Sequence, residues 1–166
     1  NFNRGVMDKD LEQLLSRDNV NLIECNLLER SEVDKLAKDY HTIYHFAAII
    51  GVTHVLNDPY RVLKDNVDLL VNVIELCRAQ KDLNRLIFTS TSEIYAGTLK
   101  HFDLTIPTPE SSPLTLTELE HPRTSYMLSK IYGEAMCQHS GVNFTIVRPH
   151  NVYGLRMGMS HVIPEL

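Results

Sequence analysis

The sequence predicts an α/β fold built around a doubly wound parallel sheet. Short runs of β-branched and aromatic residues alternate along the chain with longer segments in which apolar residues recur at helical spacing. Strands and helices that alternate in this way form right-handed βαβ units and therefore a parallel sheet. The length of 166 residues and the hydrophobic content of 43% suit one folded domain and exclude a disordered chain.

The first half of the chain predicts two helices and two strands. Leucines recur at helical spacing over residues 8–17, and a short apolar run over residues 20–25 predicts a strand. A serine is expected to cap a helix over residues 31–38. Residues 42–46, with the sequence TIYHF, are rich in β-branched and aromatic side chains and predict a second strand.

The second half predicts two longer helices and two further strands. Residues 62–79 have the longest helical periodicity, and residues 86–90 predict a buried strand. Residues 97–123 are rich in proline, serine and threonine and predict an irregular segment, which at this length is expected to be functional. A helix over residues 125–139 and a strand over residues 144–147 complete the pattern.

Composition and charge exclude several kinds of partner. Lysine and arginine number 16 against 21 aspartate and glutamate residues, so the net charge of −5 gives no general attraction to nucleic acid. No apolar run approaches the roughly 18 residues of a membrane span, and no signal peptide is recognisable, so we expect no membrane partner. The eight histidines form no metal-binding motif, and we expect no metal site. Three widely spaced cysteines indicate reduced thiols and hence a cytoplasmic protein.

One tyrosine–lysine pair stands out near the strand ends, where ligands of doubly wound sheets bind. Tyr126 and Lys130 are four residues apart on a predicted helix and therefore lie on one face, about 6 Å apart. An ammonium group this close is expected to lower the pKa of the tyrosine from about 10 toward neutrality. Such a tyrosine can take the proton of a sugar or alcohol hydroxyl while hydride leaves the same carbon, and Thr91 can donate a hydrogen bond to the same oxygen. Tyr60 and Lys64 share the spacing without such a hydroxyl nearby, and we interpret them as a solvated surface pair.

Seven short motifs occur in a characteristic order over nearly the whole chain. They are NFNRG (1–5), ECNL (24–27), YHFAA (44–48), DNV (65–67), STSEIY (90–95), YMLSK (126–130) and RPHNVYG (148–154). With these motifs the chain resembles the extended short-chain dehydrogenase/reductases, in the branch of NAD-dependent nucleotide-sugar epimerases, dehydratases and decarboxylases. The resemblance implies a Rossmann-like sheet, NAD as the cofactor, a nucleotide-sugar substrate and a homodimer formed through the two long helices.

The resemblance also implies roles for individual residues. Thr91, Tyr126 and Lys130 match the catalytic hydroxyl, tyrosine and lysine, and Tyr126 and Lys130 also match positions that contact the cofactor. The other cofactor positions are Asn1, Asn3, Arg4, Asn26, Leu27, Phe46, Ala47, Ala48, Asn66 and Pro149. The substrate positions are Ser92, Glu93 and Asn151.

Glu93 refines the expected reaction. The 4,6-dehydratases and uronate decarboxylases resemble this chain more closely than simple 4-epimerases do, because they carry a glutamate two residues beyond the catalytic hydroxyl. Once C4 is a ketone, the C5 proton is acidic, and Glu93 can serve as the C5 acid or base. Two alternatives remain: a structural role, in which a glutamate at a strand end caps a neighbouring helix, and service in an epimerase that acts at C5.

The glycine-rich phosphate loop of the family is absent from the sequence. The seven glycines nowhere form a GxxGxxG motif, and the resemblance implies that the sheet lacks its first two strands. We therefore expect an incomplete NAD-binding domain over residues 1–149 and the start of a small substrate-binding domain over residues 150–166. We also expect weak or absent NAD binding by the 166-residue chain, because the pyrophosphate would lack its helix N-terminus.

The leading hypothesis is a NAD-dependent epimerase or dehydratase, hence an isomerase or lyase, that acts on a nucleotide-activated sugar through a 4-keto intermediate. A decarboxylase of the UDP-glucuronate type is the main alternative. A non-catalytic NAD-binding or interaction module is favoured by the missing glycine loop and disfavoured by the intact set of Thr91, Tyr126 and Lys130. A simple carbonyl reductase would use the same three residues.

Overall fold

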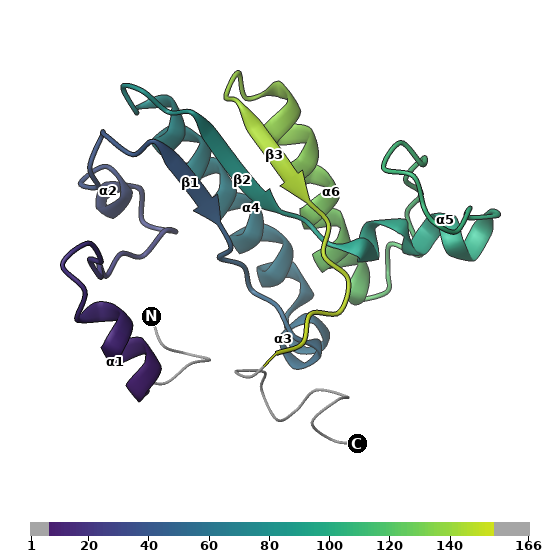
Figure 1. The fold of residues 1–166 in the computed structure, drawn as a ribbon. Coiled ribbons are helices and arrows are strands. Elements are labelled where there is room, and N and C mark those ends of the chain that lie inside the picture. Colours follow the sequence, from purple (N-terminus) through teal and green to yellow (C-terminus); the bar gives the residue numbers. More distant parts are fainter. Residues whose placement is uncertain (1–6, 155–166) are drawn as a thin grey trace.

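The computed structural model describes residues 7–154 and shows an α/β fold with a parallel sheet (Figure 1). His45 pairs with Phe88, and Thr89 pairs with Val147, so the three strands end at one edge of the sheet. The predicted fold class and the last three predicted strands are confirmed. In sheet order, the strands are β1 (Thr42–His45), β2 (Arg85–Thr89) and β3 (Phe144–Val147).

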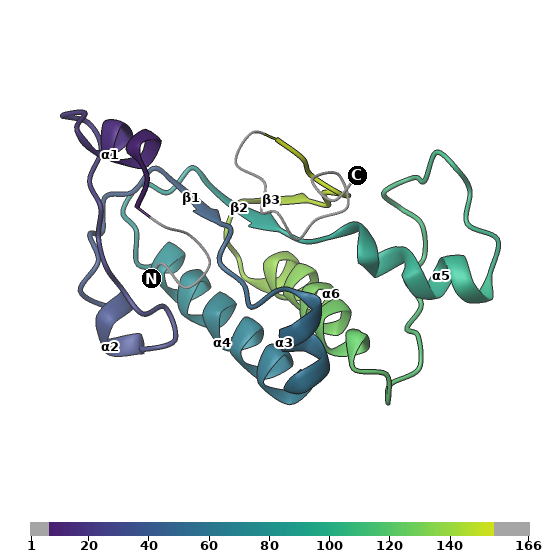
Figure 2. The same cartoon turned by 90° about the horizontal axis from the view of Figure 1, so that it is seen from below.

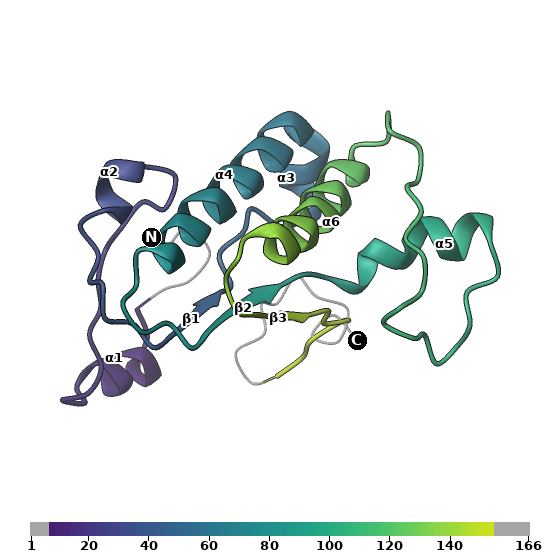
Figure 3. The same ribbon diagram turned by 90° about the horizontal axis from the view of Figure 1, so that it is seen from above.

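Two long helices, α4 (Pro59–Arg78) and α6 (Arg123–His139), cover the same face of this sheet (Figures 2 and 3). The carboxylate of Asp58 caps α4, because it accepts a hydrogen bond from the backbone N–H of Arg61 at 3.1 Å. Pro59 suits the first helical position because its fixed φ is already helical. As a result, α4 begins three residues earlier than predicted. The helix α6 begins directly after Pro122, two residues earlier than predicted.

The long helices and the sheet share one apolar core. Leu70 of α4, Cys137 of α6 and Phe88 of β2 are each at most 2% exposed. At Gly133, α6 lies so close to the sheet that a Cβ atom would be only 2.6 Å from Cζ of Phe88. This close approach places the preceding turn of α6, which carries Lys130, against the end of β2.

Three short helices lie in the connections between these elements. They are α3 (Val52–Asn57), the 3₁₀-helix η1 (Ser92–Tyr95) and α5 (Ala96–His101). The sequence does not predict them, because six residues or fewer are too short for helical periodicity to show. The segment predicted as irregular therefore begins with most of α5, and it contains no further helix or strand from residue 102 to residue 122.

The predicted strand over residues 20–25 is wrong. These residues have no strand assignment, and the side chains of Leu22 and Ile23 are 54% and 58% exposed. A strand needs a neighbour that completes its backbone hydrogen bonds, and no strand of the described part of the chain lies beside this segment.

The two N-terminal helices are present but shorter than predicted. They are α1 (Lys9–Leu15) and α2 (Arg30–Val33). The residue before α2 is Glu29, so Ser31 lies inside the helix and does not cap it. The segment before α2 is tied to α4 by Asn72, whose Nδ2 donates to the carbonyl of Leu27 at 2.8 Å.

Some predictions fall on residues that the structure does not describe. Asn1, Asn3 and Arg4 lie outside the described residues, as do residues 155–166 of the predicted substrate-binding domain. Between residues 7 and 154, none of the helices combines the length and the apolar character that crossing a membrane requires. The same residues contain no cluster of three or more His, Cys, Asp or Glu side chains suited to a metal ion.

Candidate active site

The hydroxyl groups of Thr91 and Tyr126 meet at the carboxyl edge of the sheet. Thr91 lies just beyond β2 and is 8% exposed. It caps η1, because its Oγ1 accepts a hydrogen bond from the backbone N–H of Glu93 at 3.3 Å. Tyr126 lies in the first turn of α6, and the side chain of Thr91 is close enough to its phenol to lower the pKa of the phenol. The structure thus brings together the two hydroxyls that the sequence places at one site.

Lys130 lies one turn further along α6, in a buried position that is 5% exposed. Its Nζ donates to the carbonyl of Thr89 at 2.8 Å and lies 5.1 Å from the ring centre of Phe88 and 5.7 Å from that of Tyr126. Burial lowers the pKa of this ammonium to about 8. The positive charge therefore lies below the tyrosine ring and is anchored to the strand end.

The pKa of Tyr126 is raised, whereas the spacing predicted that it would be lowered. Burial of the phenol is the largest cause and the negative charge of Glu93 is the second, while the hydroxyl of Thr91 acts in the opposite direction. The prediction is wrong because it counted only the neighbouring ammonium. Burial depends on how α6 packs against the sheet, which helix spacing does not report.

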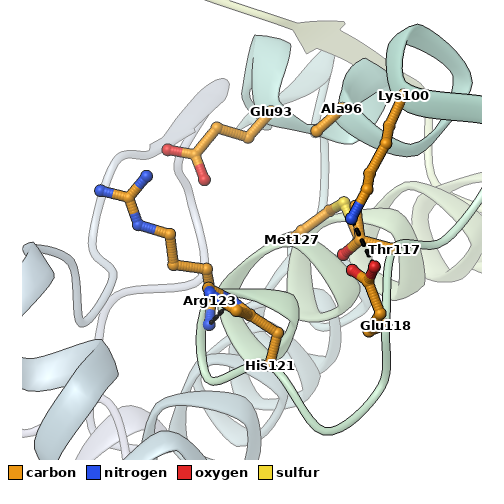
Figure 4. Close-up of a pocket in the computed structure, with 8 residues that line it drawn as sticks. All are labelled: Glu93, Ala96, Lys100, Thr117, Glu118, His121, Arg123 and Met127. Atoms are coloured by element: carbon orange, nitrogen blue, oxygen red, sulfur yellow. Dashed lines mark hydrogen bonds and ion pairs between the residues drawn. The ribbon is translucent and has the colours of Figure 1, made fainter.

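The side chain of Glu93 lines a cavity of about 350 Å³ beside Thr91 and Tyr126 (Figure 4). One wall comes from η1 and α5, with Glu93 and Lys100, and the other from the segment before α6 and its first turns, with Glu118, Arg123 and Met127. Lys100 and Glu118 form an ion pair across the cavity. Figure 4 shows the carboxylate of Glu93 and the guanidinium of Arg123 pointing toward one another at the opposite end.

Asn66, predicted to face the cofactor, holds the loop after β1. Its Oδ1 accepts from the N–H of Ile49 at 2.7 Å, and its Nδ2 donates to the carbonyl of Ile49 at 3.1 Å and to Oγ of Ser129 at 3.4 Å. Three further predicted cofactor positions lie on the same loop, and one of them, Phe46, is 68% exposed. They are Phe46, Ala47 and Ala48.

Asn26 and Leu27 precede α2, and this helix lies beyond the β1 edge of the sheet (Figure 1). The backbone N–H of Asn26 donates to the Glu32 carboxylate at 2.6 Å, and Oδ1 of Asn26 accepts from the N–H of Leu28 at 3.2 Å. These bonds fix the turn, while the Asn26 side chain stays exposed.

The remaining predicted positions lie where β2 and β3 end. The backbone N–H of Ser92 donates to the carbonyl of Pro149 at 3.0 Å, so the two chain segments stay paired beyond the strands. Ser92 and Pro149 are half-buried, and Asn151 is exposed. Pro149 therefore lies at the same sheet edge as Thr91 and Lys130, while the structure assigns Asn151 no contact with them.

The sequence did not predict a partly buried arginine clamp. Nε and Nη2 of Arg148 donate to the two carboxylate oxygens of Glu134 at 2.9 and 2.6 Å. Nη1 of Arg148 donates to the hydroxyl of Tyr95 and to the carbonyl of Glu110. One signal in the sequence points to it: Glu134 continues the spacing of four that links Tyr126 to Lys130.

Two hydroxyls beside Lys130 were missed as well. Oγ1 of Thr89 and Oγ of Ser90 are buried, and no residue of the described part of the chain is their hydrogen-bond partner. Buried polar groups are nearly always satisfied in proteins. These two atoms therefore fit a site whose bound group supplies the missing hydrogen bonds.

A parallel α/β sheet with a threonine, a tyrosine and a buried lysine gathered at the carboxyl ends of its strands defines a Rossmann-fold protein of the short-chain dehydrogenase/reductase class. The family model described as the NAD dependent epimerase/dehydratase family matches residues 4–166. The chain belongs to this family, which is NAD-dependent, and the resemblance seen in the sequence is confirmed.

Several characterised proteins are similar to the chain. A UDP-N-acetyl-alpha-D-glucosaminuronate decarboxylase of Bacillus cytotoxicus is 29% identical over 159 residues, which cover 94% of this chain and 46% of the relative. A UDP-glucuronate 4-epimerase of Thermodesulfobacterium geofontis is 27% identical over 87% of this chain and 43% of its own length. The chain thus spans about half the length of the curated relatives it matches.

Solved structures of the same class superpose on the chain. The NAD-dependent NDP-hexosamine 5,6-dehydratase TunA has a TM-score of 0.63 and 30% identity, and the match covers 84% of this chain and 43% of TunA. The UDP-Glc/GlcNAc 4-epimerase of Campylobacter jejuni has a TM-score of 0.68 and 25% identity over 83% of this chain and 40% of that enzyme.

Proposed function

We propose that this chain carries the catalytic groups of an enzyme that oxidises a nucleotide-activated sugar at C4 and then rearranges the 4-keto sugar. The observation that carries the proposal is the juxtaposition of the Thr91 and Tyr126 side chains with the ammonium of Lys130, which donates to the Thr89 carbonyl and lies 5.7 Å from the centre of the Tyr126 ring. Proton removal from an alcohol needs a base and a group that holds the oxygen, and this pair supplies both.

The residues beside Lys130 fit the cofactor of the family. The ammonium of Lys130 has three donors, of which one reaches Thr89, and the hydroxyls of Thr89 and Ser90 have no described partner. Lys130 and these hydroxyls would hold the ribose and nicotinamide end of NAD. When bound, NAD supplies the acceptor and later the donor of two electrons, and its oxidised form adds a positive charge to the site.

Tyr126 would act as the base at the C4 hydroxyl. Its raised pKa means that the phenol keeps its proton at neutral pH until positive charge enters the site. Thr91 would donate a hydrogen bond to the C4 oxygen and hold it against the phenol. Lys130 would stabilise the phenolate through its charge beneath the ring.

Glu93 would determine how the 4-keto sugar reacts after oxidation at C4. Its charge raises the pKa of Tyr126 and its side chain lines the cavity, which supports a role in taking or returning a proton at C5. Proton removal followed by loss of a C6 leaving group gives a dehydratase, whereas return of the hydride to the opposite face of C4 gives an epimerase.

Uronate decarboxylation is the second candidate. A ketone at C4 is β to a carboxylate at C6, so the C5–C6 bond breaks, its electron pair moves to the C4 oxygen, and CO2 leaves. The relative from B. cytotoxicus, which matches nearly the whole of this chain, is named a uronate decarboxylase, and this favours the candidate.

Three further expectations belong to the proposal. Residues 1–149 would form the cofactor domain and residues 150–166 the beginning of a substrate domain. The long helices α4 and α6 would form the interface of a homodimer, and the protein would act in the cytoplasm.

Replacement of Tyr126 by phenylalanine in the full-length protein tests the proposal. Because proton transfer contributes about 10²–10⁴-fold to rate, turnover of the nucleotide sugar should fall by about that factor. The matched control is Tyr60→Phe, which alters the other tyrosine–lysine pair and should leave turnover unchanged, since Tyr60 is 74% exposed. Full turnover by Tyr126→Phe would overturn the proposal, whereas a wild-type protein that binds NAD without turning over a nucleotide sugar would favour a non-catalytic module.

A further inference from the structure

Arg123 lies on the same face of α6 as the candidate active site. It precedes Tyr126 by three residues and Met127 by four, and residues at these spacings are neighbours on a helix. Its side chain is exposed and lines the cavity that Glu93 enters. It forms no ion pair with any residue between positions 7 and 154.

The other charges of this cavity have interactions of their own. Lys100 and Glu118 form an ion pair and neutralise one another. The carboxylate of Glu93 acts on the phenol of Tyr126 at the active-site end of the cavity. His121 also lines the cavity, and its Nδ1 accepts a hydrogen bond from the backbone N–H of Arg123. Among the described residues of the cavity, the guanidinium of Arg123 faces the Glu93 carboxylate without forming an ion pair with it, and can therefore also bind an incoming anion at this end (Figure 4).

We propose that Arg123 binds the carboxylate at C6 of the substrate sugar, so that the substrate is a nucleotide-activated uronate. The inference rests on the proposed function, in which the C4 oxygen lies between Thr91 and Tyr126. C6 is bonded to C5, which is bonded to C4. With C5 beside Glu93, C6 would lie in the cavity that Arg123 lines. A guanidinium presents two parallel N–H groups that match the two oxygens of a carboxylate, whereas a C6 hydroxyl offers one neutral oxygen.

The charge balance makes this recognition selective. Beside Glu93 alone, a uronate carboxylate would meet a like charge. Arg123 compensates this repulsion for a uronate and is not needed for a neutral hexose. Removal of the guanidinium should therefore weaken binding of the uronate while leaving binding of the hexose nearly unchanged.

The test compares two ligands that differ only at C6. UDP-glucuronate and UDP-glucose are titrated into the full-length protein by calorimetry, for the wild type and for Arg123→Gln. A hydrogen bond to a charged group contributes about 1.5–3 kcal/mol, so the wild type should prefer the uronate and the variant should lose about 10- to 100-fold of its uronate affinity. Affinity for UDP-glucose should change less than about threefold, and Arg123→Lys should recover part of the loss because it keeps the charge.

Lys100→Gln is the matched control, because it removes one positive charge from the same cavity without touching Arg123. If Lys100→Gln lowers the uronate preference as strongly as Arg123→Gln, the effect is one of overall charge and the proposal is wrong. It is equally wrong if the wild type binds both ligands alike or binds neither. Turnover by Tyr126→Phe reports on the proposed function separately, so a uronate preference that survives Arg123→Gln overturns only the role of Arg123.

Discussion

The guanidinium of Arg148 donates two parallel hydrogen bonds to the carboxylate of Glu134, and this pair joins the end of β3 to α6, the helix that carries Tyr126 and Lys130. A third nitrogen of Arg148 holds the hydroxyl of Tyr95, two residues beyond Glu93. One arginine therefore links the two elements whose relative position places Thr91 against Tyr126. We regard Arg148 as a positioning residue of the candidate site.

Loss of this clamp should destabilise the protein strongly. The side chains of Arg148 and Glu134 are 20% and 9% exposed, and removing one member of a buried pair leaves an uncompensated charge. Arg148→Met should lower the free energy of unfolding by about 3–5 kcal/mol in urea denaturation.

An exposed pair on another helix provides the control for Arg148→Met. Asp34→Asn breaks the Arg30–Asp34 pair, whose side chains are 48% and 53% exposed, and should change stability little. If the two variants lose similar amounts of stability, the clamp is not a structural link between β3 and α6.

The contact between Gly133 and Phe88 should tolerate no additional atom. Gly133→Ala adds a methyl group 2.6 Å from Cζ of Phe88, and overpacking of this kind costs about 1–3 kcal/mol. A favourable change in helix propensity of about 1 kcal/mol acts against this cost. We expect a net loss of stability and, because α6 is pushed from β2, a loss of turnover. Gly154→Ala is the control, since nothing lies within 4 Å of its Cβ position, and a Gly133→Ala protein as stable as this control would disprove the close contact.

Burial of Lys130 should make stability depend on pH in the alkaline range. The pKa of Lys130 is about 8 in the folded protein and 10.5 when the group is unperturbed. Between these values the unfolded chain holds the additional proton, so raising the pH favours the folded state. The free energy of unfolding of the wild type, relative to Lys130→Met, should rise by about 1–3 kcal/mol from pH 7 to pH 10. A pH-independent difference in urea titrations would show that the ammonium is not desolvated.

The sequence predicted those parts of the fold in which a local pattern is long enough to be recognised. The strands of the sheet and the helices α4 and α6 carry clear periodicity, and the motif order identified the family. The strand expected at residues 20–25 failed because a strand depends on its neighbours. The helices α3 and α5 were missed because they are only six residues long.

The candidate site was predictable to a similar extent. Helix spacing and the common edge of the strand ends indicated that Thr91, Tyr126 and Lys130 would meet. The direction of the pKa shift of Tyr126 was not predictable, because it results from burial and from Glu93. The clamp between Arg148 and Glu134 was missed because its partners come from different elements and no local rule pairs them.

Asn66 should affect cofactor binding through the loop that it holds. Its side-chain amide bonds to both the N–H and the carbonyl of Ile49, so Asn66→Leu leaves two backbone groups of the loop after β1 without these partners. Hydrogen exchange at the Ile49 amide should become faster, and NADH titration of the full-length protein should show weaker binding. The matched control is Asn72→Leu on the same helix, which releases Leu27 instead and should leave exchange at Ile49 unchanged. Weaker NADH binding with unchanged exchange at Ile49 would instead indicate that Asn66 contacts the cofactor directly, as the family resemblance implies.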